Sequence, residues 1–567
     1  YLHEEQFEIS TALQSDKSVV LSAPTSFGKS LLIEEVVASK KYKNIVIIQP
    51  TLALLDETRK KLSKYNDIYK IIVSTSQTPS QEQGNLFLFT GERVVEYNMF
   101  PQIDFFIIDE FYKLSLKRDD DRAITLNTAL HRLLKFTNKF YMLGPMIKEI
   151  PIEFMQKYDL LWFPSDFRTV AVDEISLEIS EKLKKKEKEL KKKEELFDLL
   201  ISTEEPTLIY CSSPKKATEL AVEFVTYLKE KKPDFISDKK NGSVMEWLYE
   251  NINRNWFLIE GLKRYTAIHH GAVPRHLGST IVDLFNKKSI RYLFCTSTLI
   301  EGVNTSAKNV ILFDKKKGTK DIDFFDYKNI AGRSGRMNNY FIGNVYRFEA
   351  KPNQLELNVD IPIFSQDDAP LEILINLDDS ELKESSKLRL QEFDGFDEEF
   401  KEILRRNSSL PIQGQINILN EIEENIEKYF ELLNWDNYPR YKNLEVVFEL
   451  CWNNLLKSKD NKAGVLSSKQ LASLAMKYNF KKSTKGVIDE LINDEYWVNQ
   501  IPDELNRINY LSYFVLNVTR HWFDYKLPKW ISLINDIQKY AFNKRGLSYG
   551  NYSFYASQLE NGFLPIN

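Results

Sequence analysis

The sequence predicts two tandem α/β units, each with a mainly parallel sheet, followed by a mostly α-helical C-terminal region. Short apolar runs typical of buried strands recur along residues 1–350, and segments with a helical apolar period separate most of them. Amphipathic helical segments mark the C-terminal third. The chain has 567 residues, of which 43% are hydrophobic and 28% are charged, so it is long enough for several folded domains and is not a disordered protein.

Eight apolar runs are the predicted strands. Four precede residue 150, namely Val19–Leu21, Ile45–Ile48, Phe105–Ile108 and Phe140–Leu143, and four follow residue 200, namely Thr207–Tyr210, Tyr265–Ile268, Ile290–Phe294 and Val310–Phe313. Ligands of open α/β sheets bind beyond the carboxyl ends of the strands, so the polar residues that follow these strands are the candidate site residues.

The predicted organisation has five segments. Residues 1–165 and 201–350 are the two α/β domains, residues 166–200 are a charged linker or exposed helix, residues 351–460 are an acidic helical region, and residues 461–567 are a basic, aromatic helical region. Lys and Glu alternate in EKLKKKEKELKKKEELF (Glu181–Phe197), which is typical of a solvated helix rather than of a nucleic-acid patch.

The last two segments contain amphipathic helices. Ile416–Trp435 has apolar residues at helical spacing, and Ser467 and Gln470 have the spacing of a capping box at the start of a second helix. A third helix is expected at Lys485–Asp494. The second and third helices and their basic turn could form a helix-turn-helix in a winged-helix domain, or an ordinary αα-hairpin.

Net charge, cysteine content and hydropathy limit the classes of function. The net charge of −4 argues against nucleic-acid binding over the whole surface, although residues 1–350 are mildly basic. Cys211, Cys295 and Cys451 are isolated, which indicates a reducing compartment, and no apolar run reaches ~18 residues. We therefore expect a cytoplasmic protein with no membrane partner. Because the first residue is Tyr1 rather than Met, we also expect a fragment or a missing start.

The first predicted strand runs into APTSFGKS, a strand–GxxxxGK[ST]–helix pattern with Ala in place of the first Gly. Gly28 lets backbone N–H groups approach phosphate oxygens, Lys29 would reach the β/γ-phosphates, and the Ser30 hydroxyl would bind Mg²⁺. Gln6 could hydrogen-bond an adenine edge. The predicted ATP-binding residues of this region are Gln6, Ala23, Pro24, Thr25, Ser26, Phe27, Gly28, Lys29 and Ser30.

Two further clusters carry chemistry. FFIIDEFY places Asp109 at a strand end, where it suits the Mg²⁺ shell, and Glu110 next to it, where it suits deprotonating the attacking water. NIAGRSGR places Arg333 and Arg336 three residues apart, as expected for arginine fingers that stabilise charge on a γ-phosphate. The alternative is an RSGR loop that binds any acidic group. We expect Lys29, Asp109, Glu110, Arg333 and Arg336 to be catalytic.

In this order the motifs resemble those of superfamily 2 helicases of the DExH-box, Ski-like branch. The resemblance rests on GKS, QPTLALL, FTGER, DEFY, LGP, YCSS, HHG, TSTLIEGVN and AGRSGR, which span roughly residues 1–350. It implies two RecA-like P-loop domains, a winged-helix and ratchet-like helical region, ATP hydrolysis with Mg²⁺, and 3′-to-5′ movement along nucleic acid. Glu301 and Gly302 would join the ATP site.

The resemblance also implies contacts with the backbone of the tracked strand. The residues carried over for this role are Pro50, Thr51, Thr90, Gly91, Arg93, Ser212, His270 and Thr296. The chain departs from the family pattern at Ala23, at Tyr112 in place of His or Asp, at Gly144-Pro145 in place of Ser-Ala-Thr, and at Asn329 in place of Gln. The last three positions couple the ATP state to nucleic acid in the family.

More narrowly, DEFYK, Asp119–Asn127 and KFYMLGP are similar to the helicase subunit of the Hachiman anti-phage systems. That resemblance implies a bacterial defence helicase that acts on single-stranded DNA with a nuclease effector as partner; RNA stays open, because the motifs read the backbone rather than the sugar. A rival hypothesis is an ATP-gated clamp that holds and releases a nuclease with little unwinding, with the acidic region as its docking face. A P-loop kinase would have no use for the second α/β unit.

Overall fold

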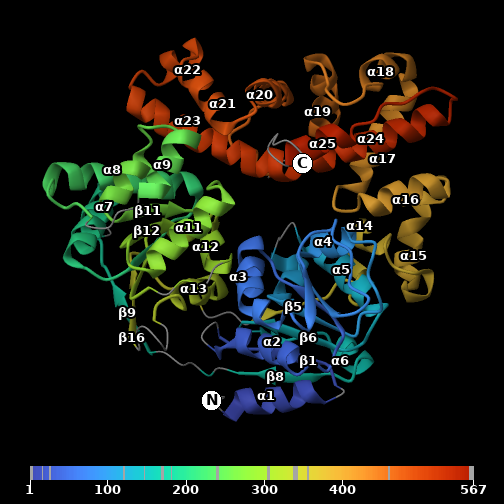
Figure 1. Ribbon diagram of the computed structural model, residues 1–567, viewed down its shortest axis with the longest axis horizontal. Helices are drawn as coiled ribbons and strands as arrows, with labels where there is room; N and C mark the ends of the chain where they lie inside the picture. Colours follow the sequence, from blue (N-terminus) through green and yellow to red (C-terminus); the bar gives the residue numbers. More distant parts are fainter. Residues whose placement is uncertain are drawn as a thin grey trace. The chain divides into compact units, whose positions relative to one another are not determined.

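The computed structural model describes all residues except 1–3, 16, 25–26, 119–121, 146, 166, 168–170, 181, 238–241, 303–304, 306, 336–341, 354–356, 458–459 and 561–567 (Figure 1). The chain forms two compact units. Unit 1 contains residues 1–213 and 291–390, and unit 2 contains residues 214–290 and 391–567. Among the described residues, no helix is both long enough and apolar enough to cross a bilayer.

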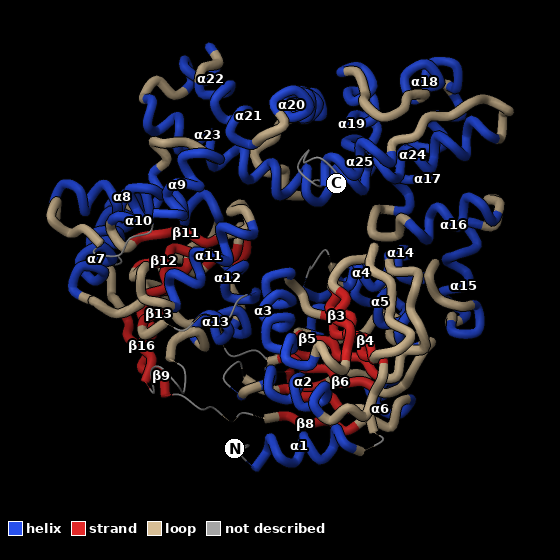
Figure 2. Tube along the Cα trace, in the orientation of Figure 1, coloured by secondary structure: helices blue, strands red, loops and turns tan. Residues whose placement is uncertain are grey.

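Unit 1 contains a seven-stranded parallel sheet in the order β3-β4-β2-β5-β6-β1-β8, whose strands are red in Figure 2. The strands are β1 (Val19–Ser22), β2 (Asn44–Ile48), β3 (Tyr69–Ile72), β4 (Gly84–Phe89), β5 (Phe105–Asp109), β6 (Phe140–Gly144) and β8 (Leu161–Pro164). All four predicted strands of this region are present. The sequence reading missed β3, β4 and β8.

The alternation of side chains along these strands builds two cores, one on each face of the sheet. One core receives α1 (Glu4–Gln14), α2 (Lys29–Ala38) and α3 (Leu52–Leu62), and the other receives α4 (Gly91–Glu96), α5 (Ala123–Leu134) and α6 (Ile152–Lys157). Burial on both faces explains why these strands are continuous apolar runs.

A second sheet has six strands in the order β11-β12-β10-β13-β16-β9. Its strands are β9 (Ala171–Ser176), β10 (Thr207–Tyr210), β11 (Thr266–His269), β12 (Tyr292–Cys295), β13 (Asn309–Leu312) and β16 (Ile342–Arg347), and all but β11 belong to unit 1. The other elements of this part of unit 1 are α7 (Lys185–Ser202), α12 (Ser297–Gly302), α13 (Phe324–Ala331) and the short strands β14 (Lys316–Lys317) and β15 (Lys320–Asp321).

The segment predicted as a charged linker, residues 166–200, contains structured elements. β9 pairs in parallel with β16, and α7 buries Leu196, Phe197 and Leu200. Lys192 on α7 is also buried, and its ammonium pairs with Glu349 at 3.1 Å. The helix prediction is therefore correct, but charge alternation hid an apolar stripe that fixes α7 to its unit. The predicted domain boundaries otherwise remain predictions.

Part of the acidic region returns to the first sheet. Residues 357–382, here called the strap, contain β17 (Leu357–Asn358), α14 (Leu371–Leu374) and the 3₁₀ turn Asp379–Glu381, and α15 (Glu384–Leu390) follows them. β17 pairs with β7 (Ile147–Glu149), and the strap adds Val359, Ile361, Ile363, Ala369, Ile373, Leu374 and Leu377 to the core under α5. This part of the predicted docking face is therefore turned inward.

Polar contacts pin the strap to the first sheet. The Ser115 hydroxyl donates a hydrogen bond to Asp360, and the Lys135 ammonium pairs with Asp378 at 2.9 Å. His131 Nε2 and Glu381 Oε2 are hydrogen-bonded at 2.6 Å.

The described part of unit 2 is helical apart from β11. Its helices are α8 (Pro214–Lys231), α9 (Gly242–Asn251), α10 (Phe257–Lys263), α11 (Arg275–Asn286), α16 (Glu398–Arg406), α17 (Ile412–Glu424), α18 (Ile426–Leu433), α19 (Tyr441–Leu455), α20 (Ser468–Lys481), α21 (Thr484–Ile492), α22 (Glu495–Gln500), α23 (Glu504–Val518), α24 (Leu527–Asn543) and α25 (Ser553–Glu560), and a π-helical stretch (Thr519–Lys526) joins α23 to α24. The prediction of a mostly helical C-terminal region is confirmed for the described part of residues 391–560.

Two details of that prediction change. The single helix expected over Ile416–Trp435 is two helices, because the backbone leaves helical geometry at Asn425, with φ −126° and ψ 42°. One of the two hydrogen bonds of the predicted capping box is present: the Ser467 side chain accepts a hydrogen bond from the Gln470 N–H. The Gln470 amide oxygen accepts from the Leu466 N–H instead of the Ser467 N–H. Within the described part of residues 391–560 no strand accompanies α20 and α21, so nothing there supplies the wing of a winged helix.

The strap yields a pH-dependent prediction. Burial raises the pKa of Glu381, but the hydrogen bond and charge of His131 outweigh burial, so the pKa lies below its usual 4.5. The carboxylate therefore stabilises the fold above about pH 4.5 and loses that effect as the pH falls through its folded-state pKa. We expect Glu381→Gln to lower the free energy of unfolding by ~1 kcal/mol or less near pH 7.

Chemical denaturation of wild type and Glu381→Gln between pH 3 and pH 7 would measure this difference. It should shrink as the pH falls below about 4.5, whereas Asp379→Asn, at an exposed neighbouring carboxylate, should show little difference at any pH. A difference between wild type and Glu381→Gln that is constant with pH would contradict this account.

Candidate functional site

The loop predicted to bind phosphate joins β1 to α2. Gly28 caps α2 with a φ of 89°, a left-handed conformation that glycine adopts without strain. A Cβ atom there would lie 2.6 Å from Gln6 Nε2. The same Gln6 amide donates a hydrogen bond of 2.6 Å to the Phe27 carbonyl oxygen, so Gln6 braces the loop from α1. The predicted contact of Gln6 with an adenine edge is untested.

Lys29 is the first residue of α2, and its side chain is buried. Among the described residues, none accepts a hydrogen bond from Lys29 Nζ. A buried ammonium without a hydrogen-bond acceptor is costly unless an anion approaches it, so the loop fits a phosphate group. Ser30 is the next residue and is exposed, while Thr25 and Ser26 lie outside the described residues.

The two predicted catalytic carboxylates lie at the end of β5. Glu110 follows Asp109 with a φ of 57°, which is uncommon for a residue other than glycine and is often found at active sites. Burial raises the pKa of Asp109, and Lys29 opposes that rise. Burial also raises the pKa of Glu110 to about 7, with Lys29 opposing and Asp109 adding to the rise. A carboxyl group that titrates near neutral pH suits a general base.

The end of β6 lies between the phosphate loop and the carboxylates, because β6 pairs with both β1 and β5. The Ala23 N–H donates a hydrogen bond of 2.9 Å to the Gly144 carbonyl oxygen. A Cβ at Gly144 would lie 2.9 Å from Ile147 and 3.3 Å from Phe111. Gly144, which stands where the family has the start of Ser-Ala-Thr, therefore packs closely on the segment after Glu110.

Arg333 brings positive charge to the same site. It follows α13 by two residues, and its charge opposes the rise in the pKa of both Asp109 and Glu110. Lys29, Asp109, Glu110 and Arg333 therefore share one electrostatic site in unit 1. Arg336 lies outside the described residues, and for Glu301 and Gly302 only the backbone, at the end of α12, is described.

Tyr112 connects the carboxylates to α13. It lies in the 3₁₀ helix Phe111–Leu114 that follows Glu110, and its ring meets the Phe325 ring edge-on, with centroids 4.5 Å apart. Phe325 is the second residue of α13, the helix that ends just before Arg333. An aromatic contact thus joins the segments that carry Glu110 and Arg333, where a polar residue is usual in the family.

Sequence reasoning missed two residues of this site. Gln49 follows β2 and its Nε2 donates a hydrogen bond of 3.1 Å to Asp109 Oδ2, while Thr58 donates one of 2.7 Å to Gln49 Oε1. A buried glutamine directly after a strand was a signal that could have found Gln49. Phe325 gave no such signal, because an apolar residue at a helix start is ordinary.

The predicted nucleic-acid contacts of the first sheet have mixed settings. The Thr51 hydroxyl caps α3 by accepting a hydrogen bond from Leu54 N–H, and the Arg93 guanidinium donates a hydrogen bond of 2.6 Å to the Val73 carbonyl oxygen. Pro50 offers its carbonyl oxygen to Arg122 at 2.6 Å. Thr90 caps α4 with its backbone but makes no side-chain capping bond, and Gly91 is buried as the first residue of α4. The Thr90 hydroxyl, which makes no capping hydrogen bond, is therefore the best placed of these groups to bind a phosphate.

On the second sheet, Ser212 and Thr296 follow strand ends. The Ser212 N–H donates a hydrogen bond of 2.8 Å to Asp314, and the Thr296 hydroxyl lies 3.3 Å from that of Thr298. α12, which follows Thr296, packs against α3, which follows Thr51. This contact brings predicted nucleic-acid residues of the two sheets onto neighbouring elements of unit 1.

His270 has a different setting in unit 2. It is buried, its Nε2 lies 2.9 Å from the Thr218 hydroxyl, and its Nδ1 accepts a hydrogen bond of 3.3 Å from Ala272 N–H. Its ring faces Tyr513 on α23 edge-on, with centroids 6.0 Å apart, and burial lowers the pKa of His270 to about 3. These contacts favour a neutral packing residue over the predicted contact with a phosphate.

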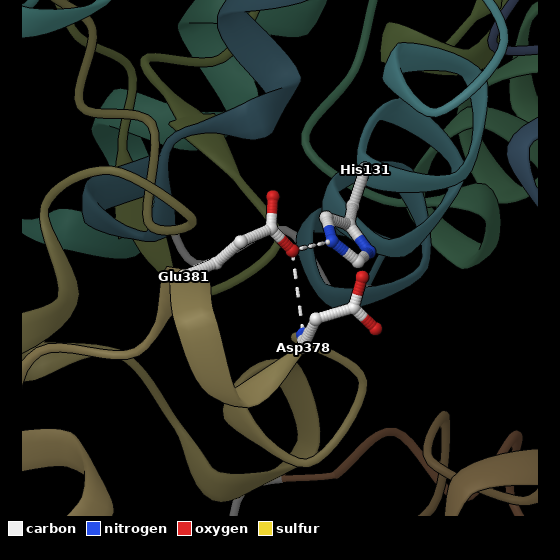
Figure 3. Close-up of side chains that lie close together, drawn as sticks. All are labelled: His131, Asp378 and Glu381. Atoms are coloured by element: carbon white, nitrogen blue, oxygen red, sulfur yellow. Dashed lines mark hydrogen bonds and ion pairs between the residues drawn. The ribbon is translucent and has the colours of Figure 1, made fainter.

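The strap adds a cluster of possible metal ligands. Figure 3 shows His131, Asp378 and Glu381, whose ligand atoms lie within 4.8 Å of one another. His131 and Glu381 bond to each other, and the Lys135 ammonium lies 2.9 Å from Asp378. A cation would have to break the hydrogen bond between His131 and Glu381 and displace Lys135 from Asp378. The cluster therefore holds the strap in place.

Comparison with known proteins places this site in a class. Residues 4–143 match the DEAD/DEAH box helicases, and residues 191–338 match the helicase conserved C-terminal domain. The fold and the motifs therefore define a two-domain, ATP-dependent helicase, and the resemblance to superfamily 2 helicases is confirmed.

The chain is 32% identical to Anti-bacteriophage protein B of Escherichia coli K12 over 99% of this chain and 77% of that protein, and it belongs to the same family. It is 23% identical to human Helicase POLQ-like over 57% of this chain and 33% of that protein. It is 22% identical to the ATP-dependent DNA helicase Hel308 of Pyrococcus horikoshii over 58% of this chain and 48% of that helicase. The chain thus spans half or less of these last two relatives.

The contact between Tyr112 and Phe325 is testable. Phe325→Ala should lower kcat for ATP by on the order of tenfold to a hundredfold, because α13 would no longer hold Arg333 in place. KM should change little, since the phosphate loop is untouched. Steady-state ATPase kinetics would measure both constants.

Phe324→Ala, at the neighbouring buried position of α13, is the matched control. An equal loss of kcat in both variants would mean that α13 simply fails to fold. Retention of wild-type kcat in Phe325→Ala would show that the aromatic contact does not position the site.

Proposed function

We propose that the protein is a Mg²⁺- and ATP-dependent motor that moves 3′ to 5′ along single-stranded DNA in a bacterial defence against phage, together with a nuclease partner. The observation that carries the ATPase part is the shared site of Lys29, Asp109, Glu110 and Arg333, supplied by segments of both sheets. Such a site depends on how the two sheets approach one another, which suits a motor driven by nucleotide binding.

The residues present fit Mg²⁺-ATP. Lys29 Nζ and Glu110 Oε2 are buried and lack hydrogen-bond partners among the described residues, so both are available to a ligand and its attacking water. The loop backbone around Gly28 and Lys29 would hold the phosphates, and Ser30 and Asp109 would hold the metal ion with hard oxygen ligands. When bound, the ion would neutralise charge on the β- and γ-phosphates.

Each protein group then has a defined task. Glu110 would orient the attacking water and take its proton, which its raised pKa favours. Gln49 holds Asp109 in position by its hydrogen bond. Arg333 would stabilise negative charge that develops on the γ-phosphate, as a planar guanidinium can, and Arg336 is proposed for the same task from sequence alone.

DNA as the substrate is supported by the relatives. Hel308 is named an ATP-dependent DNA helicase, and Anti-bacteriophage protein B is named for defence. The resemblance to Hachiman helicases supports the nuclease partner, and the resemblance to the Ski-like branch supports the polarity. The predicted contacts from Thr90, Ser212 and Thr296 involve hydroxyl groups, which bind phosphates without reading sequence.

Lys29→Ala tests the proposed function. ATP hydrolysis should rise with single-stranded DNA in the wild type and fall to background in the variant, because the phosphates lose their buried cation. The assay compares DNA with RNA at one stated salt concentration, and strand displacement compares 3′ with 5′ overhangs. Stimulation by RNA alone would redirect the proposal to RNA. DNA-stimulated hydrolysis without displacement would favour the clamp.

Glu110→Gln separates binding from hydrolysis. The change is nearly isosteric and removes the proton acceptor, so we expect ATP and single-stranded DNA to bind as in the wild type while kcat falls by about 10²- to 10⁴-fold. Fluorescent-nucleotide binding and turnover assays measure the two effects. If the variant cannot bind ATP, Glu110 has a structural role instead.

A further inference from the structure

Phe480 is an aromatic side chain with no apolar cover. α20 buries Leu471, Leu474 and Tyr478 on one face, whereas Phe480 lies on the other face in the last turn and is 77% exposed. Exposing so much apolar surface costs free energy in water, and an exposed ring is a feature of surfaces that stack on a ligand.

Lysines outnumber carboxylates in the sequence on both sides of Phe480. Residues 467–492 contain five lysines and two carboxylates, Asp489 and Glu490. Lys477 and Lys481 pair with Glu490, and Lys485 pairs with Asp489 at 3.6 Å. Lys469 pairs with Glu445 at 3.7 Å, so the lysine of this stretch that makes no side-chain pair with a described residue is Lys482, two residues after Phe480. A basic surface around an aromatic ring suits phosphate and base together.

The turn between α20 and α21 is held rigidly. The Tyr478 hydroxyl is 2.5 Å from that of Thr519, in the π-helical stretch. Lys482 adopts a φ of 51° and its N–H donates to the Tyr478 carbonyl oxygen, and Ser483 caps α21 by accepting from Gly486 N–H. These contacts hold the backbone beside Phe480, so that backbone loses little conformational entropy on binding.

α21, the second helix of this pair, is unsuited to the major groove of a duplex. α21 carries Asp489 and Glu490, whose carboxylates would face phosphates if the helix entered the duplex. The helix-turn-helix hypothesis is therefore unfavourable, and the contact is limited to the turn. A phenyl ring stacks on an exposed base face, which unpaired nucleotides offer along the whole strand.

We infer that the turn between α20 and α21 is a nucleic-acid contact in which Phe480 stacks on an unpaired base while Lys482 binds the adjoining phosphate. This inference rests on the proposed function, since it takes the single strand that the motor tracks as its ligand. It adds a contact of unit 2 to those predicted from the helicase motifs.

The test uses the full chain, a fluorescein-labelled oligo-dT strand and a blunt duplex, with fluorescence anisotropy over a salt series. Phe480→Ala should weaken binding of the strand by roughly 5- to 100-fold, as expected for loss of one stacked base, and Phe480→Trp should retain it. Lys482→Gln should reduce the magnitude of the salt slope by about 0.7, the value for one phosphate contact on a single strand.

Tyr496→Ala is the matched control, because Tyr496 on α22 is also 59% exposed but has Asp494 and Glu495 beside it. It should bind the strand as the wild type does, and thermal melts should show all variants folded. If the wild type does not bind the strand, the proposed function fails.

If the wild type binds the strand but Phe480→Ala stays within twofold of it, the inference fails and the proposed function stands. Equal losses in Phe480→Ala and Tyr496→Ala, or equal losses on the strand and the blunt duplex, would also overturn the inference.

Discussion

Two adjacent, half-buried carboxylates at the end of β5 set an electrostatic constraint on unit 1. Asp109 and Glu110 would repel each other and resist ionisation without nearby cations. Lys29 approaches them from the phosphate loop and Arg333 from the end of α13, so the same pair of acids depends on both sheets. Because each cation lies on a different segment, any change in the approach of these segments alters the charge balance at the carboxylates. This is the physical basis on which the phosphates of a bound nucleotide, by adding negative charge, can alter the charge balance of the site.

Packing holds these segments at positions where the family has polar residues. Gly144 allows β6 to lie close against Phe111, and Tyr112 meets Phe325 through ring contact. The strap fills the remaining core beside α5 and is fastened by Ser115, His131 and Lys135. Apolar contacts depend on distance and shape more than on charge. They can therefore hold the segments of a site together without fixing its charge balance, which a bound nucleotide can change.

Within unit 2, the C-terminal helices that follow residue 391 contact the helices beside β11. Asn509 on α23 accepts a hydrogen bond of 2.9 Å from Phe257 N–H at the start of α10, and Lys485 on α21 donates to the Tyr249 carbonyl oxygen on α9 at 3.4 Å. Tyr513 on α23 packs on His270. His270, which belongs to a helicase motif, thus packs against the C-terminal helices. A displacement of α23 would therefore alter the packing directly after β11.

The sequence by itself determined four strands of each sheet, the phosphate loop, the adjacent carboxylates and the family, because burial on both faces and short catalytic motifs leave local signals. It missed β3, β4, β8, β9 and β16. It did not determine the inward turn of the acidic strap, the break at Asn425, the bracing role of Gln6 or the burial of His270. Nor could it pair Tyr112 with Phe325, which lie far apart along the chain. Local periodicity shows which residues are buried, whereas the partner of a buried group is decided by which distant segment fills the adjoining space, and only the tertiary structure contains that information.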